Sequence, residues 1–142
     1  MRISRLWGWC LMLVVAGVVG LVGCSSGGGT LATSATPTLE TQQSTPAAVA
    51  AGMRKIEQIA QDIAASAGTD KARAADLASQ IEPAWRPIED TVKQNDPNTY
   101  LTMEDNFAVL KTAADHGDTA AAAKGAAAIS SAVQDYVARY PG

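Results

Sequence analysis

The sequence predicts an all-α fold, a single antiparallel four-helix bundle formed by residues 46–142. Three observations lead to this prediction. Apolar residues after residue 46 recur at alternating steps of three and four, which is the spacing of one helix face. Each periodic segment is bounded by residues typical of helix ends. No stretch alternates polar and apolar residues as a half-buried strand does. Four apolar helix faces joined by short turns pack together as a bundle.

The first expected helix spans about residues 46–67. Thr45 is a suitable cap, and Pro46 occupies the first helical position, where a missing backbone N–H costs nothing. Gly68 is typical of the residue that follows a helix. The expected apolar face consists of Val49, Met53, Ile56, Ala60, Ile63 and Ala67.

The second expected helix spans about residues 70–94 and contains two prolines, Pro83 and Pro87. A proline inside a helix costs about 3 kcal/mol or more, so one alternative breaks this segment at Glu82 into two short helices. However, the apolar face passes both prolines without a change of phase, which favours one helix kinked near Glu82. This face consists of Ala74, Leu77, Ile81, Trp85, Ile88 and Val92.

The third and fourth expected helices have the clearest boundaries. Asp96 caps the third helix, Pro97 lies in its first turn, and the pair His116-Gly117 ends it. Asp118 then caps the fourth helix directly. The apolar face of the third helix consists of Tyr100, Met103, Phe107, Leu110 and Ala114. That of the fourth consists of Ala122, Ala126, Ile129, Val133, Tyr136 and Tyr140.

Residues 1–23 have the pattern of a secretory signal peptide. Arg2 and Arg5 precede an uncharged apolar segment, residues 6–23, which ends in small residues. The alternative is a transmembrane helix, which needs about 20 apolar residues. The segment contains several glycines and no charged stop-transfer signal follows it, so the signal peptide is the preferred interpretation.

The end of this segment, L-V-G-C at residues 21–24, resembles the lipobox of bacterial lipoproteins. The resemblance implies that the Cys24 thiol receives a diacylglyceryl group and that the chain is cleaved just before it. Palmitate-type acyl chains would then hold the protein on the extracytoplasmic side of the cell membrane or outer membrane, as a periplasmic or cell-surface lipoprotein. The other cysteine, Cys10, would leave with the signal peptide, so no disulfide is expected.

Residues 24–45 are expected to be a lipidated cysteine followed by a flexible tether. The segment is rich in serine, threonine and glycine, and its one charge is Glu40. Such a composition buries too little apolar surface to offset the entropy of ordering the chain. A flexible coil of this length spans about 25 Å on average. The domain organisation is therefore a signal peptide (1–23), a tether (24–45) and a helical domain (46–142).

The densest polar stretch is E-P-A-W-R-P-I-E-D-T-V-K, residues 82–93. A solvated flank explains its charges, since residues four apart on a helix form ion pairs worth about 0.2–0.5 kcal/mol each. The expected pairs are Glu82–Arg86, Arg86–Asp90 and Glu89–Lys93.

A second interpretation of these charges is a metal site. Glu82 and Glu89 lie two turns apart beside Trp85, and Glu104 or Asp105 of the next helix is available to join them. Carboxylates of facing helices bind metals inside bundles, and imidazole adds a further ligand type. His116 is the more distant candidate ligand.

The run I-E-P-A-W-R-P-I-E-D-T-V-K-Q-N-D-P-N-T-Y-L-T-M-E-D and the later A-A-D-H-G-D are similar to helical domains of bacterial iron-uptake systems. These are the imelysin-like periplasmic proteins and the extracytoplasmic helical segments associated with iron permeases. The resemblance implies a helical accessory of metal uptake. The histidine-containing metal motif of imelysin-like proteins is absent from the sequence.

The function expected from the sequence is that of a non-enzymatic binding or scaffold module of the cell envelope, acting on another envelope protein. No nucleophile–base pair or phosphate-binding loop is recognisable, so neither catalysis nor a cofactor is expected apart from the acyl modification at Cys24. The net charge of −3 and the lack of a basic face argue against nucleic-acid binding. The alternative is a metal-binding accessory of an uptake system for iron- or copper-type ions, using carboxylates of the second and third helices.

Overall fold

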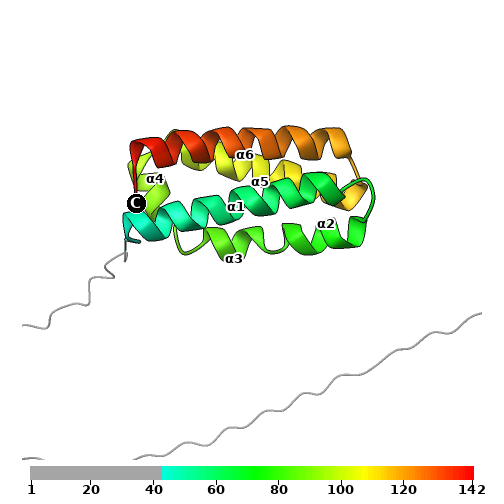
Figure 1. Cartoon of the computed structure of the whole chain (residues 1–142), viewed down its shortest axis with the longest axis horizontal. Helices are drawn as coiled ribbons and strands as arrows, with labels where there is room; N and C mark the ends of the chain where they lie inside the picture. Colours follow the sequence, from blue (N-terminus) through cyan, green and yellow to red (C-terminus); the bar gives the residue numbers. More distant parts are fainter. Residues whose placement is uncertain (1–42) are drawn as a thin grey trace, which may run out of the picture. The chain divides into compact units, whose positions relative to one another are not determined.

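The computed structural model describes residues 43–142, and this part of the chain is all-helical with no β-strand (Figure 1). None of its helices combines the length and the hydropathy that a membrane span requires. The predicted signal peptide, Cys24 and most of the predicted tether lie outside the described residues. The helices are α1 (Pro46–Ser66), α2 (Lys71–Ala78), α3 (Ile81–Trp85), α4 (Glu89–Asn95), α5 (Pro97–His116) and α6 (Thr119–Arg139).

The three long helices lie side by side and form most of a helical bundle (Figure 1). Helix α6 packs against both α1 and α5. Helix α2 packs against α1 and α5 on the other side, and α3 packs against α1. Helix α4 packs against α5 at the end of the bundle where the C-terminus lies. The all-α prediction is therefore confirmed for the described residues.

The long helices begin at the residues that the sequence predicts, and α5 ends as predicted, whereas α1 ends at Ser66 with Ala67 rather than Gly68 as its cap. Thr45 accepts a hydrogen bond from the backbone N–H of Ala48 and so caps α1. Asp96 caps α5 and Asp118 caps α6 in the same way. Gly117 follows α5 with a φ of 72°, a left-handed conformation that glycine adopts without steric cost. Because capping depends only on neighbouring residues, it is readable from sequence.

The segment between α1 and α5 differs from its prediction. The single helix kinked near Glu82 is wrong, because the chain forms three short helices with breaks after α2 and after α3. Pro83 lies in the first turn of α3, where its missing N–H is harmless, but its ring excludes a helix that continues from Ser79. Pro87 lies between α3 and α4 and cannot donate to the carbonyl of Pro83.

The apolar faces nevertheless point inward as predicted. Trp85, Ile88 and Val92 are buried although two helix breaks separate the predicted helix into parts. The breaks thus redirect the backbone without changing which side chains enter the core. The largest fully buried side chains are Trp85, Tyr136, Met53, Ile56, Ile63, Met103, Leu110, Ile129, Val49, Val92 and Val133.

The start of the bundle includes a residue that the sequence assigns to the tether. The backbone N–H of Ser44 donates to Oγ1 of Thr91 at 2.9 Å. Its hydroxyl donates to the carbonyl oxygen of Pro87 at 2.6 Å. Contact with the bundle therefore begins before Pro46, at the end that carries α4.

Candidate functional site

The three predicted glutamates come from three helices around Trp85. Glu82 lies on α3, Glu89 is the first residue of α4, and Glu104 lies on α5. Burial raises the pKa of the Glu89 carboxyl, and the negative charges of Glu82, Asp90 and Glu104 raise it further, while Arg86 opposes them. The neighbouring negative charges therefore disfavour ionisation of Glu89.

Glu104 has a structural partner in this group. Oε1 of Glu104 accepts a hydrogen bond from the indole Nε1 of Trp85 at 2.5 Å. Trp85 is completely buried, stacks with Tyr100 at 6.0 Å between ring centroids and meets Phe107 edge-on at 5.3 Å. A buried indole N–H requires an acceptor, and Glu104 provides it.

Glu82 is held differently, at the surface. Its carboxylate lies 3.4 Å from the guanidinium of Arg86, and both side chains are more than half exposed. The predicted pairs Arg86–Asp90 and Glu89–Lys93 are not among the ion pairs of residues 43–142. The break between α3 and α4 interrupts the helical spacing on which Arg86–Asp90 depends. Lys93 instead lies 5.0 Å above the ring of Tyr100.

The structure does not bring His116 to the carboxylates. His116 ends α5, twelve residues beyond Glu104, which corresponds to about 18 Å along the helix. Its exposed side chain lines a different hollow, together with Val109 and Ala121. Within the described part of the chain, no three His, Cys, Asp or Glu residues are grouped closely enough to hold a metal ion.

Glu82 and Glu104 do line a common hollow of about 210 Å³ between α3 and α5. Phe107 and Lys111 line it as well. Two carboxylates beside an aromatic ring attract cations, but the ammonium group of Lys111 offsets part of that charge. Asp105, the alternative to Glu104 in the predicted site, is exposed and is not among these lining residues.

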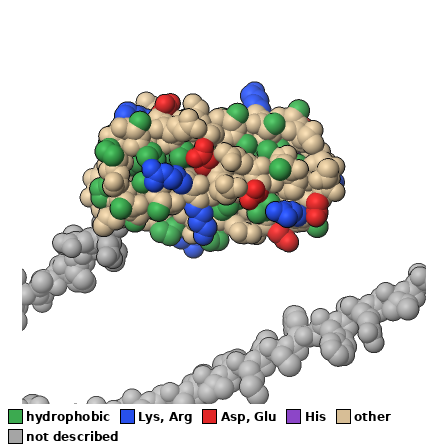
Figure 2. All heavy atoms as spheres, in the orientation of Figure 1, with side chains coloured by type: hydrophobic (Ala, Val, Ile, Leu, Met, Phe, Trp, Pro, Cys, Tyr) green, Lys and Arg blue, Asp and Glu red, His purple; other side chains and the backbone are tan. Residues whose placement is uncertain are grey.

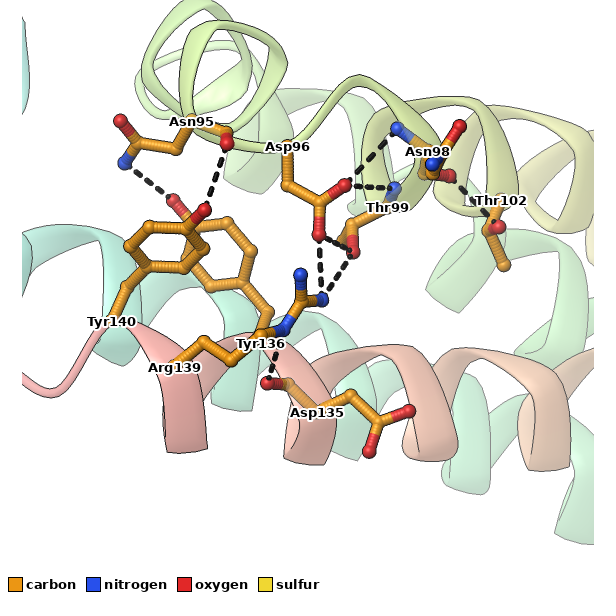
Figure 3. A network of polar contacts seen from close by, with 9 residues as sticks. All are labelled: Asn95, Asp96, Asn98, Thr99, Thr102, Asp135, Tyr136, Arg139 and Tyr140. Atoms are coloured by element: carbon orange, nitrogen blue, oxygen red, sulfur yellow. Dashed lines mark hydrogen bonds and ion pairs between the residues drawn. The ribbon is translucent and has the colours of Figure 1, made fainter.

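The strongest polar network lies elsewhere, at the junction of α4 and α5 with the end of α6 (Figure 3). Asp96 is 7% exposed and accepts hydrogen bonds from the backbone N–H groups of Asn98 and Thr99 and from the Thr99 hydroxyl. Nη2 of Arg139 lies 2.6 Å from its Oδ2. Burial acts to raise the pKa of the Asp96 carboxyl, but these hydrogen bonds and the Arg139 charge together lower it.

Two tyrosines extend this network toward α4 (Figure 3). Nδ2 of Asn95 donates to the hydroxyl oxygen of Tyr136 at 2.9 Å, and the Tyr140 hydroxyl donates to the carbonyl oxygen of Asn95 at 2.8 Å. The tyrosine rings lie 4.7 Å apart. Burial is the main reason why the pKa of Tyr136 is raised. The network therefore ties the last turn of α6 to the α4–α5 junction and has the character of a structural clasp.

Of the residues in this clasp, the sequence predicts Asp96 as a helix cap and places Tyr136 and Tyr140 on an apolar helix face. No local pattern indicates Arg139 or Asn95, because their partners lie more than forty residues away in the chain. The motif D-P-N-T signals the cap itself, but no local pattern signals which distant cation reaches it.

The outward side of α5 is a further candidate surface. Leu101 and Val109 are the exposed large hydrophobic side chains of residues 43–142, with 57% and 38% exposure. At 100° per residue they fall on one side of the helix with four other exposed residues. We call this surface the α5 outer face; it consists of Leu101, Asp105, Ala108, Val109, Thr112 and His116.

Comparison of the chain with protein-family models, curated proteins and solved structures found no match. The resemblances to bacterial lipoproteins and to imelysin-like proteins therefore stay predictions from the sequence.

Proposed function

We propose that the protein is a lipoprotein of the cell envelope that works as a non-enzymatic binding module. In this proposal Cys24 carries the acyl chains, residues 1–23 are the signal peptide, and residues 24–45 connect the anchor to the domain. The observation that carries it is L-V-G-C at residues 21–24, directly after an apolar segment with a basic start. Two or more acyl chains anchor a protein stably, whereas one chain binds reversibly.

We further propose that the domain of residues 46–142 is a four-helix bundle in which the second helix is replaced by α2, α3 and α4. The packing of α1 on α2 and α3, and of α5 on α2 and α4, supports this assignment. Such a bundle presents long helix surfaces to a partner. The α5 outer face, with exposed Leu101 and Val109, is the surface that best supports binding.

Surface charge also supports a protein partner over a nucleic acid. On the side shown in Figure 2, basic and acidic side chains are interspersed with apolar ones and do not gather into a basic patch. Nucleic-acid binding depends on such a patch to neutralise phosphates.

The anchor is tested by replacing each cysteine in turn and labelling the cells with an alkyne analogue of palmitate. We expect label on the wild type and on Cys10→Ala, with the mature chain beginning at residue 24 by mass spectrometry. Cys24→Ala is expected to be unlabelled and uncleaved at that site. A wild-type chain that retains residues 1–23, or a labelled Cys24→Ala variant, contradicts the proposal.

The alternative function is metal binding by Glu82, Glu89 and Glu104 as part of an uptake system. It requires these side chains to move together on binding, because within residues 43–142 they are not grouped closely enough to hold an ion. The observation in its favour is the raised pKa of Glu89, since a divalent cation relieves the repulsion among these carboxylates. Trp85 reports on this region, because Glu104 bonds its indole. The other tryptophans, Trp7 and Trp9, lie in the predicted signal peptide.

The metal alternative is tested by titrating the mature chain with Fe²⁺, Cu²⁺, Zn²⁺ and Mn²⁺ while Trp85 fluorescence and heat are recorded. Submillimolar binding that is lost in Glu89→Gln and kept in His116→Gln supports a carboxylate site. The absence of a response to all four ions removes this alternative.

A further inference from the structure

The α5 outer face does not contribute to the bundle core. Met103 and Leu110 of the same helix are fully buried, whereas Leu101 is 57% exposed and Val109 is 38% exposed. They lie eight residues apart, which corresponds to about 12 Å along α5. Asp105 lies midway between them and is exposed. The face therefore presents two apolar points separated by one negative charge.

A hollow of about 450 Å³ adjoins this face between α5 and α6. Small side chains meet there: Ala108 and Ala113 of α5 and Ala121 of α6 line it, together with Val109. The α6 residue Gly125 is buried beside Val109 and Leu110, where an added Cβ would come within 3.4 Å of their side chains.

The shape of the hollow favours a side chain from a docking protein over a whole small molecule. Its lining residues belong to α5, to α6 and to the cap Asp118, so the outward side has no wall. Small-molecule sites enclose about 70–90% of the ligand surface. An apolar side chain from a helix lying along α5 needs only the apolar lining that Ala108, Val109 and Ala113 provide.

Charge distinguishes a different partner from a second copy of this chain. In an antiparallel pairing of two α5 outer faces, Leu101 of each copy meets Val109 of the other. Asp105 then lies near the two-fold axis and faces Asp105 of the second copy. Two negative charges in contact oppose association. Asp105 takes part in no ion pair within residues 43–142. The complementary group is therefore basic.

We propose that the α5 outer face binds an amphipathic helix of another envelope protein. That helix places apolar side chains on Leu101 and in the hollow at Val109, and a lysine or arginine between them against Asp105. Helices bind grooves through apolar residues at such spacings, and the charge match selects the partner and its register. This inference rests on the proposed function as a binding module and names the surface and the partner chemistry.

The test uses two fluorescein-labelled helical peptides and the full mature chain, purified from whichever cell fraction contains it. Both peptides carry leucines two turns apart. One has a lysine between the leucines, and the other has a glutamate there. Fluorescence anisotropy measures binding to the wild type and to Asp105→Lys. Asp76→Lys is the matched control, since Asp76 is also exposed but lies on α2.

We expect the wild type to prefer the lysine peptide by about tenfold and Asp105→Lys to prefer the glutamate peptide. Asp76→Lys should keep the wild-type preference, and Leu101→Ser and Val109→Ser should bind both peptides more weakly. Surface substitutions of this kind leave folding nearly unchanged, which circular dichroism verifies.

Three outcomes overturn the inference. These are no binding of either peptide, an unchanged preference in Asp105→Lys, and a wild-type dimer in sedimentation that Leu101→Ser dissociates. The last result would assign the face to a second copy. The acylation of Cys24 is measured separately, so failure of the anchor and failure of this surface are distinguishable.

Discussion

The guanidinium of Arg139 lies 2.6 Å from the carboxylate of Asp96 and joins the last turn of α6 to the cap of α5. Asp96 is nearly buried, whereas the Arg139 side chain is 52% exposed. The carboxylate therefore depends on Arg139 and on Thr99 for the interactions that water would otherwise provide. This ion pair joins α6 to the α4–α5 junction, at the end of the bundle where the described chain begins and ends (Figure 1).

Removal of the cation should destabilise the fold. We expect Arg139→Ala to lower the free energy of unfolding by about 1–2 kcal/mol, less than for a fully buried pair because Arg139 is half exposed. Arg73→Ala on the exposed side of α2 is the control and should change it by less than about 0.5 kcal/mol. Urea unfolding followed by circular dichroism measures both. Equal midpoints for the two variants would show that the Arg139 contact contributes nothing.

The lowered pKa of Asp96 predicts a loss of stability in acid. The unfolded carboxyl titrates at about 3.9, and the folded one titrates lower because of its hydrogen bonds and Arg139. The stabilisation is therefore complete above about pH 4 and is lost as the pH falls toward the folded pKa. Asp96→Asn keeps a good cap but removes this titration.

Thermal unfolding from pH 6 to pH 2 tests this prediction. The stability difference between the wild type and Asp96→Asn should shrink as the pH falls below about 4. The prediction fails if the difference is the same at both ends of this range.

Ionisation of Glu89 should destabilise the fold, in contrast to ionisation of Asp96. Burial raises the pKa of its carboxyl, as do the charges of Glu82, Asp90 and Glu104, so its ionised form is disfavoured in the folded state. Glu89→Gln is therefore expected to raise the melting temperature at pH 7. The gain should disappear below about pH 4.3, where the unfolded glutamate is also protonated. A melting temperature that is unchanged or lower at pH 7 would contradict this assignment.

Glu104 should contribute to stability as the acceptor for Trp85. Glu104→Ala leaves the indole N–H of a completely buried side chain without its partner, which costs about 1–3 kcal/mol. Glu104→Gln keeps an acceptor oxygen at the same place and should cost less. Urea unfolding of the two variants gives the comparison. If they are equally stable, the hydrogen bond is not what holds Glu104 beside Trp85.

The α5 outer face connects these structural findings to function. The clasp at Asp96 and the Glu104–Trp85 hydrogen bond fix α5 at both its first turn and its middle. The helix is thus a rigid support for Leu101, Asp105 and Val109, and a rigid surface loses little entropy when a partner binds.

The sequence by itself determined where the long helices lie and which of their faces are buried. Thr45, Asp96 and Asp118 are caps, and Gly117 ends α5, as their residue types predict. These features are local, because a cap satisfies backbone groups within its own first turn. The apolar spacing is equally local, and it placed Trp85 in the core although the helix around it is broken.

Only the tertiary structure decided what depends on residues far apart in the chain. Pro83 and Pro87 break the single helix through local backbone constraints, but only packing against α1 and α5 keeps the side chains of the resulting short helices inward. Arg139 pairs with Asp96 because the end of α6 lies against the start of α5. Trp85 donates to Glu104 because α3 and α5 bring these two side chains into contact. Hydrogen bonds and ion pairs form between groups that are close in space, and periodicity along the chain carries no information about that distance.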